Sequence, residues 1–224
     1  MRPAAAGVAL GLALAVGAPT TWVLTLPSAA AGAPVAEVLS APSSTSAATL
    51  PGRLPDRSVD RFPNRYPEAT ARPAEQVPAP ERITSDDLGI DAPVDAVGVG
   101  PDGSMELPGD VDRTGWYRFG PAPGQGGSAV IAGHVEDVEQ GLGALAPLRT
   151  AEAGDAIAVT DAEGTTTRWR VVARELIRKR ALPLDDLFRR DGPPRLTLLT
   201  CGGPFLEEYG SYRDNVVVVA EPLR

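Results

Sequence analysis

Cys201, His134 and Arg213 are residues whose types and positions could together support acyl transfer. Cys201 ends the apolar run RLTLLTC, His134 follows the apolar run SAVIAG, and Arg213 lies just before NVVVVAE. A thiolate is a nucleophile, a histidine can hand a proton to a leaving amine, and an arginine can donate hydrogen bonds to an oxyanion. The three side chains therefore suit a cysteine-dependent acyl-transfer site.

Each of these residues also has a purely structural interpretation. Cys201 is the only cysteine of the chain and His134 is its only histidine. A lone cysteine at the end of an apolar strand is commonly buried and unreactive, and a lone histidine commonly serves packing. An arginine before a strand is commonly a solvated flank. Residue types alone leave both interpretations open.

Strands must position the three residues. The last two apolar runs, RLTLLT and NVVVVAE, are joined by the loop GGPFLEEYGSY. If they pair as antiparallel neighbours, the end of the first and the start of the second share one edge, so Cys201 lies near Arg213. His134 joins them if its strand runs parallel to the Cys201 strand in the same sheet. The sequence leaves that last step open.

Short apolar runs separated by turn signals fill residues 81–224. We expect a hairpin around Ala162-Glu163-Gly164, one or two helical turns in GLGALAPLRT, and a short helix in LPLDDLF with Pro183 near its start. About seven or eight short strands with little helix are typical of a closed barrel or a sandwich. The sequence therefore predicts a mainly β domain.

Two segments precede this domain. No residue from Ala4 to Leu26 is charged, and a run of that length can cross a hydrocarbon core of about 30 Å. The alanines at 29–31 also resemble a signal cleavage site, so residues 1–31 are predicted to be a membrane anchor or a cleaved signal segment. Residues 32–80 are rich in Pro and Ala and poor in large apolar side chains, which predicts a disordered linker. Either reading of residues 1–31 exports the rest of the chain.

The composition argues against several function classes. A formal net charge of −8 disfavours sequence-independent nucleic-acid binding, which needs a basic surface. One histidine and one cysteine are too few for the usual zinc sites, and no spacing matches a metal motif, so no metal or cofactor is predicted. In an exported chain, a single cysteine has no internal disulfide partner.

Three motifs resemble those of the sortase family. They are TLLTC at 197–201, AGH at 132–134 and YRDNVVVVA at 212–220. The flanking stretches LGIDAPVDAVGV, GWYRFGPAPG and LTCGGPF are most similar to class F sortases. The resemblance covers residues of about 81 to 224 and implies a closed eight-stranded sortase-type β-barrel with one or two short helices.

The resemblance implies a cysteine transpeptidase that cleaves a Leu-Pro-x-Thr-Gly sorting motif between Thr and Gly. Cys201 is then the nucleophile that forms a thioacyl intermediate, and His134 is the general acid. Arg213 stabilises the oxyanion and holds the substrate, and Thr200 helps to bind substrate. Asp214 could pair with Arg213 or point away, and the sequence assigns no orienting residue to His134.

The resemblance also implies partners and a location. The partners are secreted proteins that carry a C-terminal sorting signal and an amine of a cell-wall precursor. The location is the outer face of the membrane of a Gram-positive bacterium, through the N-terminal segment. Two alternatives use the same domain: a cysteine peptidase that only hydrolyses, and a non-catalytic surface module. An L,D-transpeptidase is disfavoured, because HGC is absent and His134 and Cys201 lie far apart in sequence.

Overall fold

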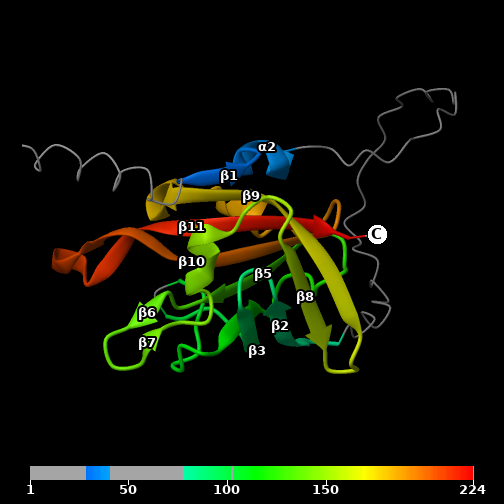
Figure 1. Cartoon of the computed structure of the whole chain (residues 1–224), viewed down its shortest axis with the longest axis horizontal. Coiled ribbons are helices and arrows are strands. Elements are labelled where there is room, and N and C mark those ends of the chain that lie inside the picture. Colours follow the sequence, from blue (N-terminus) through cyan, green and yellow to red (C-terminus); the bar gives the residue numbers. More distant parts are fainter. Residues whose placement is uncertain (1–28, 41–77, 102, 224) are drawn as a thin grey trace, which may run out of the picture.

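The computed structural model describes residues 29–40, 78–101 and 103–223, and their main body is a closed β-barrel (Figure 1). The order around it is β9-β11-β10-β5-β4-β3-β2-β8, and β8 pairs with β9 to close the ring. The predicted eight-stranded barrel is therefore confirmed. Its strands are β2 (Pro80–Ser85), β3 (Ile90–Val97), β4 (Thr114–Tyr117), β5 (Ser128–Gly133), β8 (Ala156–Asp161), β9 (Thr166–Arg178), β10 (Arg195–Leu206) and β11 (Ser211–Pro222).

Short elements connect these strands. The α-helix α3 (Leu184–Leu187) follows Pro183, and the 3₁₀ turn η1 (Ala146–Thr150) follows the Gly-rich stretch after His134. Both agree with the predicted helical turns, because proline fits the first turn of a helix. The remaining elements are a small hairpin, β6 (Glu136–Asp137) with β7 (Gly141–Leu142), and the 3₁₀ turns η2 (Lys179–Ala181) and η3 (Glu207–Tyr209).

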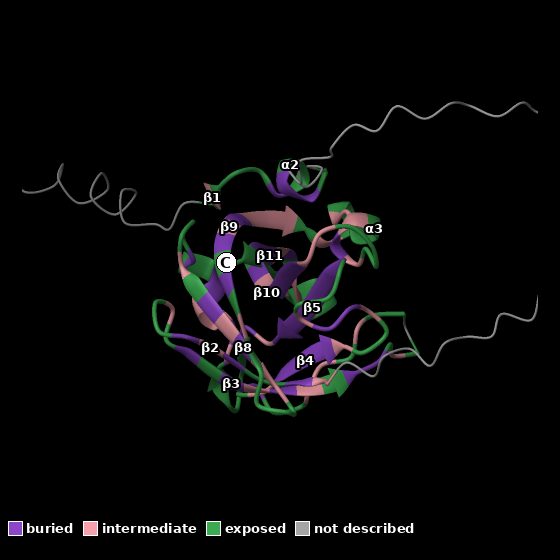
Figure 2. Cartoon of the chain, turned by 90° about the vertical axis from the view of Figure 1, so that its right-hand side faces the viewer, coloured by how far each residue is buried: buried purple, intermediate pink, exposed green. Residues whose placement is uncertain are grey.

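The central strands β5, β10 and β11 are buried on both faces (Figure 2). One face of each fills the barrel interior, with Ile131, Leu198 and Val216 among its residues. The opposite face carries an outer cluster that includes Leu199 and Val217. A strand covered on both sides reads as a continuous apolar run, which explains the patterns SAVIAG, RLTLLT and NVVVVA.

The start of the predicted linker is ordered, which corrects the expectation of disorder from residue 32 onward. Residues 30–32 form β1 (Ala30–Gly32) and residues 35–40 form α2 (Val35–Ser40), which lies over β9 (Figure 1). The cause is an apolar stripe, Val35, Val38 and Leu39, that is buried against the barrel. That stripe is under two helical turns long, too short to stand out in a Pro/Ala-rich sequence.

The expectations for residues 1–28 and 41–77 lie outside the described residues. The uncharged run Ala4 to Leu26 falls in the first of these segments. Of the three alanines that resemble a cleavage site, Ala30 and Ala31 belong to β1 and Ala29 directly precedes it. Within the part of the chain that the structure describes, no helix is long and apolar enough to cross a membrane.

Candidate active site

Strand pairing brings the ends of the three predicted motifs to one edge of the barrel. β10 and β11 are antiparallel, and Cys201 lies directly opposite Asn215. β5 and β10 are parallel, with Ala132 beside Leu199. The sequence left open whether the strand before His134 runs parallel to the Cys201 strand, and it does. Cys201 comes two residues after Leu199, and His134 comes two residues after Ala132, so the two backbones are at the same level.

Cys201 and Asn215 face outward at this edge. Side chains alternate along a strand, so residues two apart point the same way. Leu199, Ala132 and Val217 belong to the outer cluster. Cys201 lies two residues after Leu199 on β10, and Asn215 lies two residues before Val217 on β11, so both face outward. Strand register places Cys201 and the backbone of His134 and Arg213 at one edge of the barrel.

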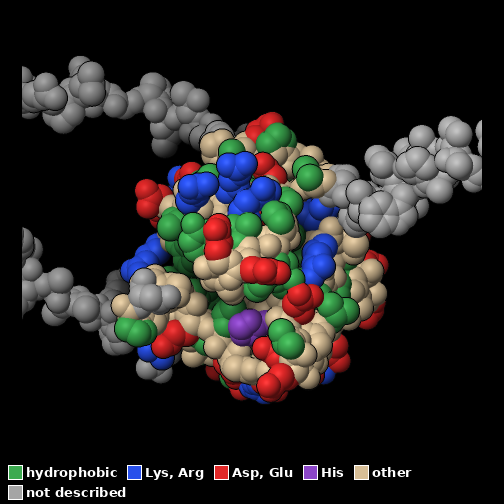
Figure 3. Space-filling view, turned by 90° about the vertical axis from the view of Figure 1, so that its left-hand side faces the viewer, with side chains coloured by type: hydrophobic (Ala, Val, Ile, Leu, Met, Phe, Trp, Pro, Cys, Tyr) green, Lys and Arg blue, Asp and Glu red, His purple; other side chains and the backbone are tan. Residues whose placement is uncertain are grey.

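His134 is half-buried and its ring is oriented by a backbone group. Its Nε2 lies 3.1 Å from the carbonyl oxygen of Pro108. A carbonyl only accepts hydrogen bonds, so this contact requires a proton on Nε2 and leaves Nδ1 as the nitrogen that can exchange one. Figure 3 shows this histidine at the molecular surface, with acidic side chains around it. The orienting group is thus a main-chain carbonyl of a loop, which no side-chain motif could reveal.

Arg213 is exposed and is held by the buried carboxylate of Asp214. Its Nε and Nη2 donate to the two carboxylate oxygens, each at 2.8 Å. Asp214 is only 2% exposed, and the hydrogen bonds from Arg213 lower the pKa of that carboxyl while raising the pKa of the guanidinium. Of the two orientations left open for Asp214, the structure shows the paired one.

The two glycines after Cys201 make room for neighbouring side chains, and the second makes room for Asp214. Gly203 has φ +73°, and a Cβ at that position would collide with the Asp214 carboxylate. A Cβ on Gly202 would approach Leu176 at 2.8 Å and Val216 at 2.9 Å. Only glycine tolerates both the left-handed backbone and the close approach at 203. Gly203 is therefore a packing requirement of the carboxylate that holds Arg213, whereas Gly202 makes room for Leu176 and Val216.

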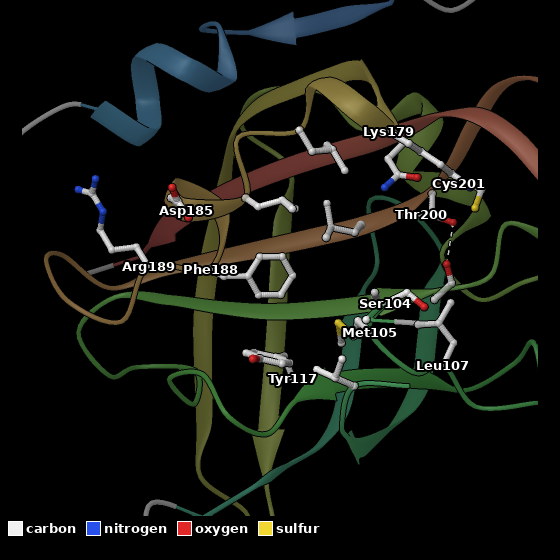
Figure 4. A pocket seen from close by; sticks show the side chains of 18 of the residues that line it. Ser104, Met105, Leu107, Tyr117, Lys179, Asp185, Phe188, Arg189, Thr200 and Cys201 are labelled. Carbon is white, nitrogen blue, oxygen red and sulfur yellow. Dashed lines mark hydrogen bonds between the residues drawn. The ribbon is translucent and has the colours of Figure 1, made fainter. Parts of the chain in front are cut away.

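A cavity of about 930 Å³ begins at Cys201 and runs toward α3. Its middle is apolar, and the rings of Tyr117 and Phe188 meet edge to face there with centroids 5.1 Å apart (Figure 4). Asp185 and Arg189 lie at the far end from Cys201 (Figure 4). His134 and Arg213 are not among the residues that line this cavity. The apolar lining residues include Met105, Leu107, Tyr117, Leu182, Phe188 and Leu199.

Thr200 lines the same cavity, but its hydroxyl is already engaged. Its Oγ1 donates to the carbonyl oxygen of Gly133 at 2.9 Å, a bond drawn in Figure 4. Thr200 is buried, and the bond ties β10 to the last residue of β5. The contact fixes the relative height of Cys201 and His134, the residues that follow Thr200 and Gly133.

Asn215 is a candidate that the sequence reasoning missed. It lies directly across from Cys201 and lines the cavity beside it. Side chains of such cross-strand pairs have Cβ atoms about 4.5–5.5 Å apart, so Asn215 and Cys201 are neighbours in the cavity wall. A usable signal existed, since Asn215 lies two residues after Arg213 at the start of the same strand.

A second pairing braces the His134 side of the site. The Tyr212 hydroxyl donates to a carboxylate oxygen of Glu136, and the other oxygen of Glu136 lies 3.9 Å from Arg149. The bond to Glu136 raises the pKa of Tyr212. Tyr212 precedes Arg213, and Glu136 comes two residues after His134. The contact therefore joins the start of β11, which carries Arg213, to the segment that follows His134, and the sequence offered no sign of it.

Several polar groups at this edge of the barrel are committed to protein partners. Asp214 holds Arg213, Glu136 accepts from Tyr212, and Thr200 donates to Gly133. Across residues 29–40, 78–101 and 103–223, no group of three or more His, Cys, Asp and Glu is arranged to hold a metal ion. The chemistry that this corner offers comes from a thiol, an imidazole, a guanidinium and a carboxamide.

Comparison with known proteins identifies the family. Residues 83–223 match the sortase domain model. The chain belongs to the sortase family. No match to this sortase was found among curated proteins.

Solved sortases share its fold at low sequence identity. Sortase A from Corynebacterium diphtheriae superposes with a TM-score of 0.51 at 19% identity, covering 66% of this sortase and 61% of that chain. Sortase C-1 from Actinomyces oris gives 0.50 at 19% identity, covering 64% and 73%. The pilus-related sortase C of Group B Streptococcus gives 0.50 at 18% identity, covering 65% and 68%. These similarities support the barrel and its topology.

Proposed function

We propose that this sortase is a cysteine transpeptidase of the class F type that cleaves a Leu-Pro-x-Thr-Gly sorting motif between Thr and Gly. The observation that carries the proposal is the placement of Cys201. Its thiol lies at the end of an apolar cavity, with His134 and Arg213 at the same corner of the barrel. An inert, packing cysteine would not need a cavity in front of it.

In the first half-reaction, the Cys201 thiolate attacks the carbonyl carbon of the motif threonine. The oxyanion that forms accepts hydrogen bonds from Arg213, whose remaining N–H groups are not used by Asp214. The C–N bond to glycine then breaks, and His134 gives its Nδ1 proton to the leaving amine. The Nε2 proton stays on the ring and continues to be donated to the Pro108 carbonyl oxygen. The products are a thioester on Cys201 and a free amino group on the departing peptide.

In the second half-reaction, an amine of a cell-wall precursor attacks the thioester carbonyl. His134, now neutral, takes a proton from the attacking amine, and the Cys201 thiolate leaves. A new amide bond joins the secreted protein to the precursor. If water attacks in place of the amine, the same residues give hydrolysis. The two outcomes differ only in the acceptor.

The cavity suits the apolar front of the sorting motif. Leucine and proline side chains would bury against residues such as Leu107, Tyr117 and Phe188, which line its middle. Asn215, beside the thiol, can hydrogen-bond the peptide backbone next to the scissile bond, while Thr200 supports the strand under it. We place the enzyme on the outer face of the membrane of a Gram-positive bacterium, held through residues 1–28.

The test is cleavage of a fluorogenic Leu-Pro-x-Thr-Gly peptide by the full chain and by Cys201→Ala. We expect the substitution to abolish cleavage and thioester formation, the latter read by mass spectrometry. Unchanged cleavage by Cys201→Ala overturns the proposal. Addition of an amine acceptor separates transpeptidation, which gives a ligated product, from simple hydrolysis. A non-catalytic module gives neither product with the wild-type chain.

A further inference from the structure

Residues 29–40, here termed the N-terminal clasp, are bound to the barrel along their length. β1 pairs antiparallel with the second half of β9, with Ala30 opposite Glu175. The Leu176 N–H donates to Ala29, and the Ala33 N–H donates to Val172, each at 3.1 Å. The clasp therefore extends the β9 edge beyond the part that β8 occupies.

Barrel side chains satisfy both ends of the clasp helix α2. A carboxylate oxygen of Glu175 accepts the Val35 N–H at 3.1 Å, and Nη1 of Arg195 donates to the Leu39 carbonyl oxygen at 2.8 Å. An acidic group at the start and a basic group at the end of a helix also complement its dipole. A six-residue helix is not stable alone in water. Its stability therefore comes from this surface.

The turn into α2 fits only one backbone path. Gly32 has φ +78°, and a Cβ there would collide with the carbonyl oxygen of Val172. No L side chain is comfortable at this φ, and none has room there. Gly32 therefore allows the clasp to lie in close contact with the backbone of β9.

The clasp packs against the back of one wall of the cavity. Val35, Val38 and Leu39 are at most 8% exposed, and they join one apolar cluster with Leu187 of α3. α2 contacts α3 as well as β9 and β11, and it lies above α3 in Figure 2. On its other side, α3 and the residue after it present Leu184 and Phe188 to the cavity. One short helix therefore separates the clasp from the cavity.

We propose that the N-terminal clasp positions α3 and thereby sets the affinity of the cavity for its peptide. A four-residue helix has almost no stability of its own, so its place depends on burial of Leu187. With the clasp displaced, Leu187 loses the partners on its outer side and the Phe188 wall is no longer fixed. The chemistry at Cys201, on β10, is left intact. This inference rests on the proposed function, since it takes the cavity to be the peptide site.

The test compares two variants of the full chain. The double variant Val38→Asp, Leu39→Asp places charges on the buried stripe, and Ala36→Asp places one on the exposed side of the same helix. We expect the double variant to raise KM for the peptide by about tenfold or more with kcat changed less than about threefold. Ala36→Asp leaves both constants unchanged. Gly32→Ala is a milder variant that leaves the apolar stripe intact, and it is expected to raise KM in the same direction.

Amide hydrogen exchange supplies a readout that does not depend on activity. In the double variant, exchange of residues 184–188 is expected to rise by about tenfold or more while that of β3 and β4 stays constant. A lower melting temperature with unchanged KM and unchanged exchange at 184–188 overturns the inference, because the clasp would then serve stability alone. If the wild-type chain does not cleave the peptide, the proposed function fails. The exchange comparison still decides whether the clasp positions α3.

Discussion

The buried carboxylate of Asp214 grips the exposed guanidinium of Arg213 through two hydrogen bonds of 2.8 Å. The pair is formed by adjacent residues, one facing the protein and one facing solvent. These hydrogen bonds restrict the Arg213 side chain before substrate binds. Less side-chain entropy is then lost when the guanidinium binds an oxyanion in the transition state. Asp214 thus acts on the proposed reaction through Arg213, as a positioning residue.

Replacement of Asp214 by Asn is expected to lower kcat/KM by about tenfold, roughly 1.4 kcal/mol of transition-state stabilisation. The amide keeps one acceptor and loses the charge. In an Arg213→Ala background the same substitution should add little, because a positioning residue has nothing left to position. Peptide cleavage by the four proteins of this cycle measures the coupling. Additive losses would show that Asp214 acts independently of Arg213. Asp91→Asn removes the charge from an exposed ion pair with Arg82 and is the matched control. It is expected to leave kcat/KM unchanged.

Gly203→Ala is expected to destabilise the fold by about 2–4 kcal/mol, from left-handed strain and the collision with Asp214 together. Gly164→Ala is the matched control, since Gly164 has φ +81° with nothing near the missing Cβ. The difference between the two variants in the free energy of unfolding, measured with urea, gives the cost of the collision with Asp214. Equal destabilisation would mean that the Asp214 side chain moves aside without cost. The loss of Arg213 positioning should also reduce cleavage by Gly203→Ala but not by Gly164→Ala.

Acid is expected to weaken the fold partly through Asp214. The hydrogen bonds from Arg213 lower its pKa in the folded state, so the folded protein binds that proton more weakly than the unfolded chain. The stabilisation is complete above the unfolded value of about 3.9 and is lost as pH falls through the folded pKa. Urea unfolding at pH 7 and pH 3 should therefore show a destabilisation by Asp214→Asn that is larger at pH 7. A difference that stays constant with pH contradicts this linkage.

Thr200→Val should destabilise the protein by about 1–3 kcal/mol, because it leaves the buried Gly133 carbonyl without its donor. Thr200→Ser keeps the hydroxyl and is expected to retain most of the stability. Urea unfolding measures the two variants, and peptide cleavage well below their melting temperatures separates structure from substrate binding. A serine variant that is stable but binds peptide poorly would assign Thr200 a direct contact through its methyl group.

Asn215→Ala is expected to reduce kcat/KM by about tenfold through loss of a hydrogen bond to the peptide backbone. Asn215→Asp keeps the shape and introduces a negative charge beside Cys201, which disfavours the thiolate. The rate of Cys201 alkylation across pH should therefore shift to higher pH in the aspartate variant and stay in place in the alanine variant. If both variants cleave the peptide at the wild-type rate, the carboxamide of Asn215 does not contact the bound peptide.

The sequence predicted the barrel well because its strands are covered on both faces, which produces continuous apolar runs. It also predicted that Cys201 and Arg213 share an edge, since one loop joins their strands. The sequence could not predict the parallel pairing of β5 with β10, because that contact depends on how the whole barrel closes. It also could not predict the contact of His134 with the Pro108 carbonyl or the hydrogen bond between Tyr212 and Glu136. Backbone acceptors and exposed pairs leave no pattern of residue types.

The clasp also fixes the position of the residue that precedes residue 41. Ser40 ends a helix bound to the barrel, and Pro78 leads into β2, so both described flanks belong to the same body. The Ala29 carbonyl accepts a hydrogen bond from Leu176 of β9, so the chain is bound to the barrel from its first described residue. Under the proposed attachment through the N-terminal segment, no residue after Ala29 can therefore lengthen the connection between bilayer and barrel. We expect the active site to stay within a limited distance of the bilayer.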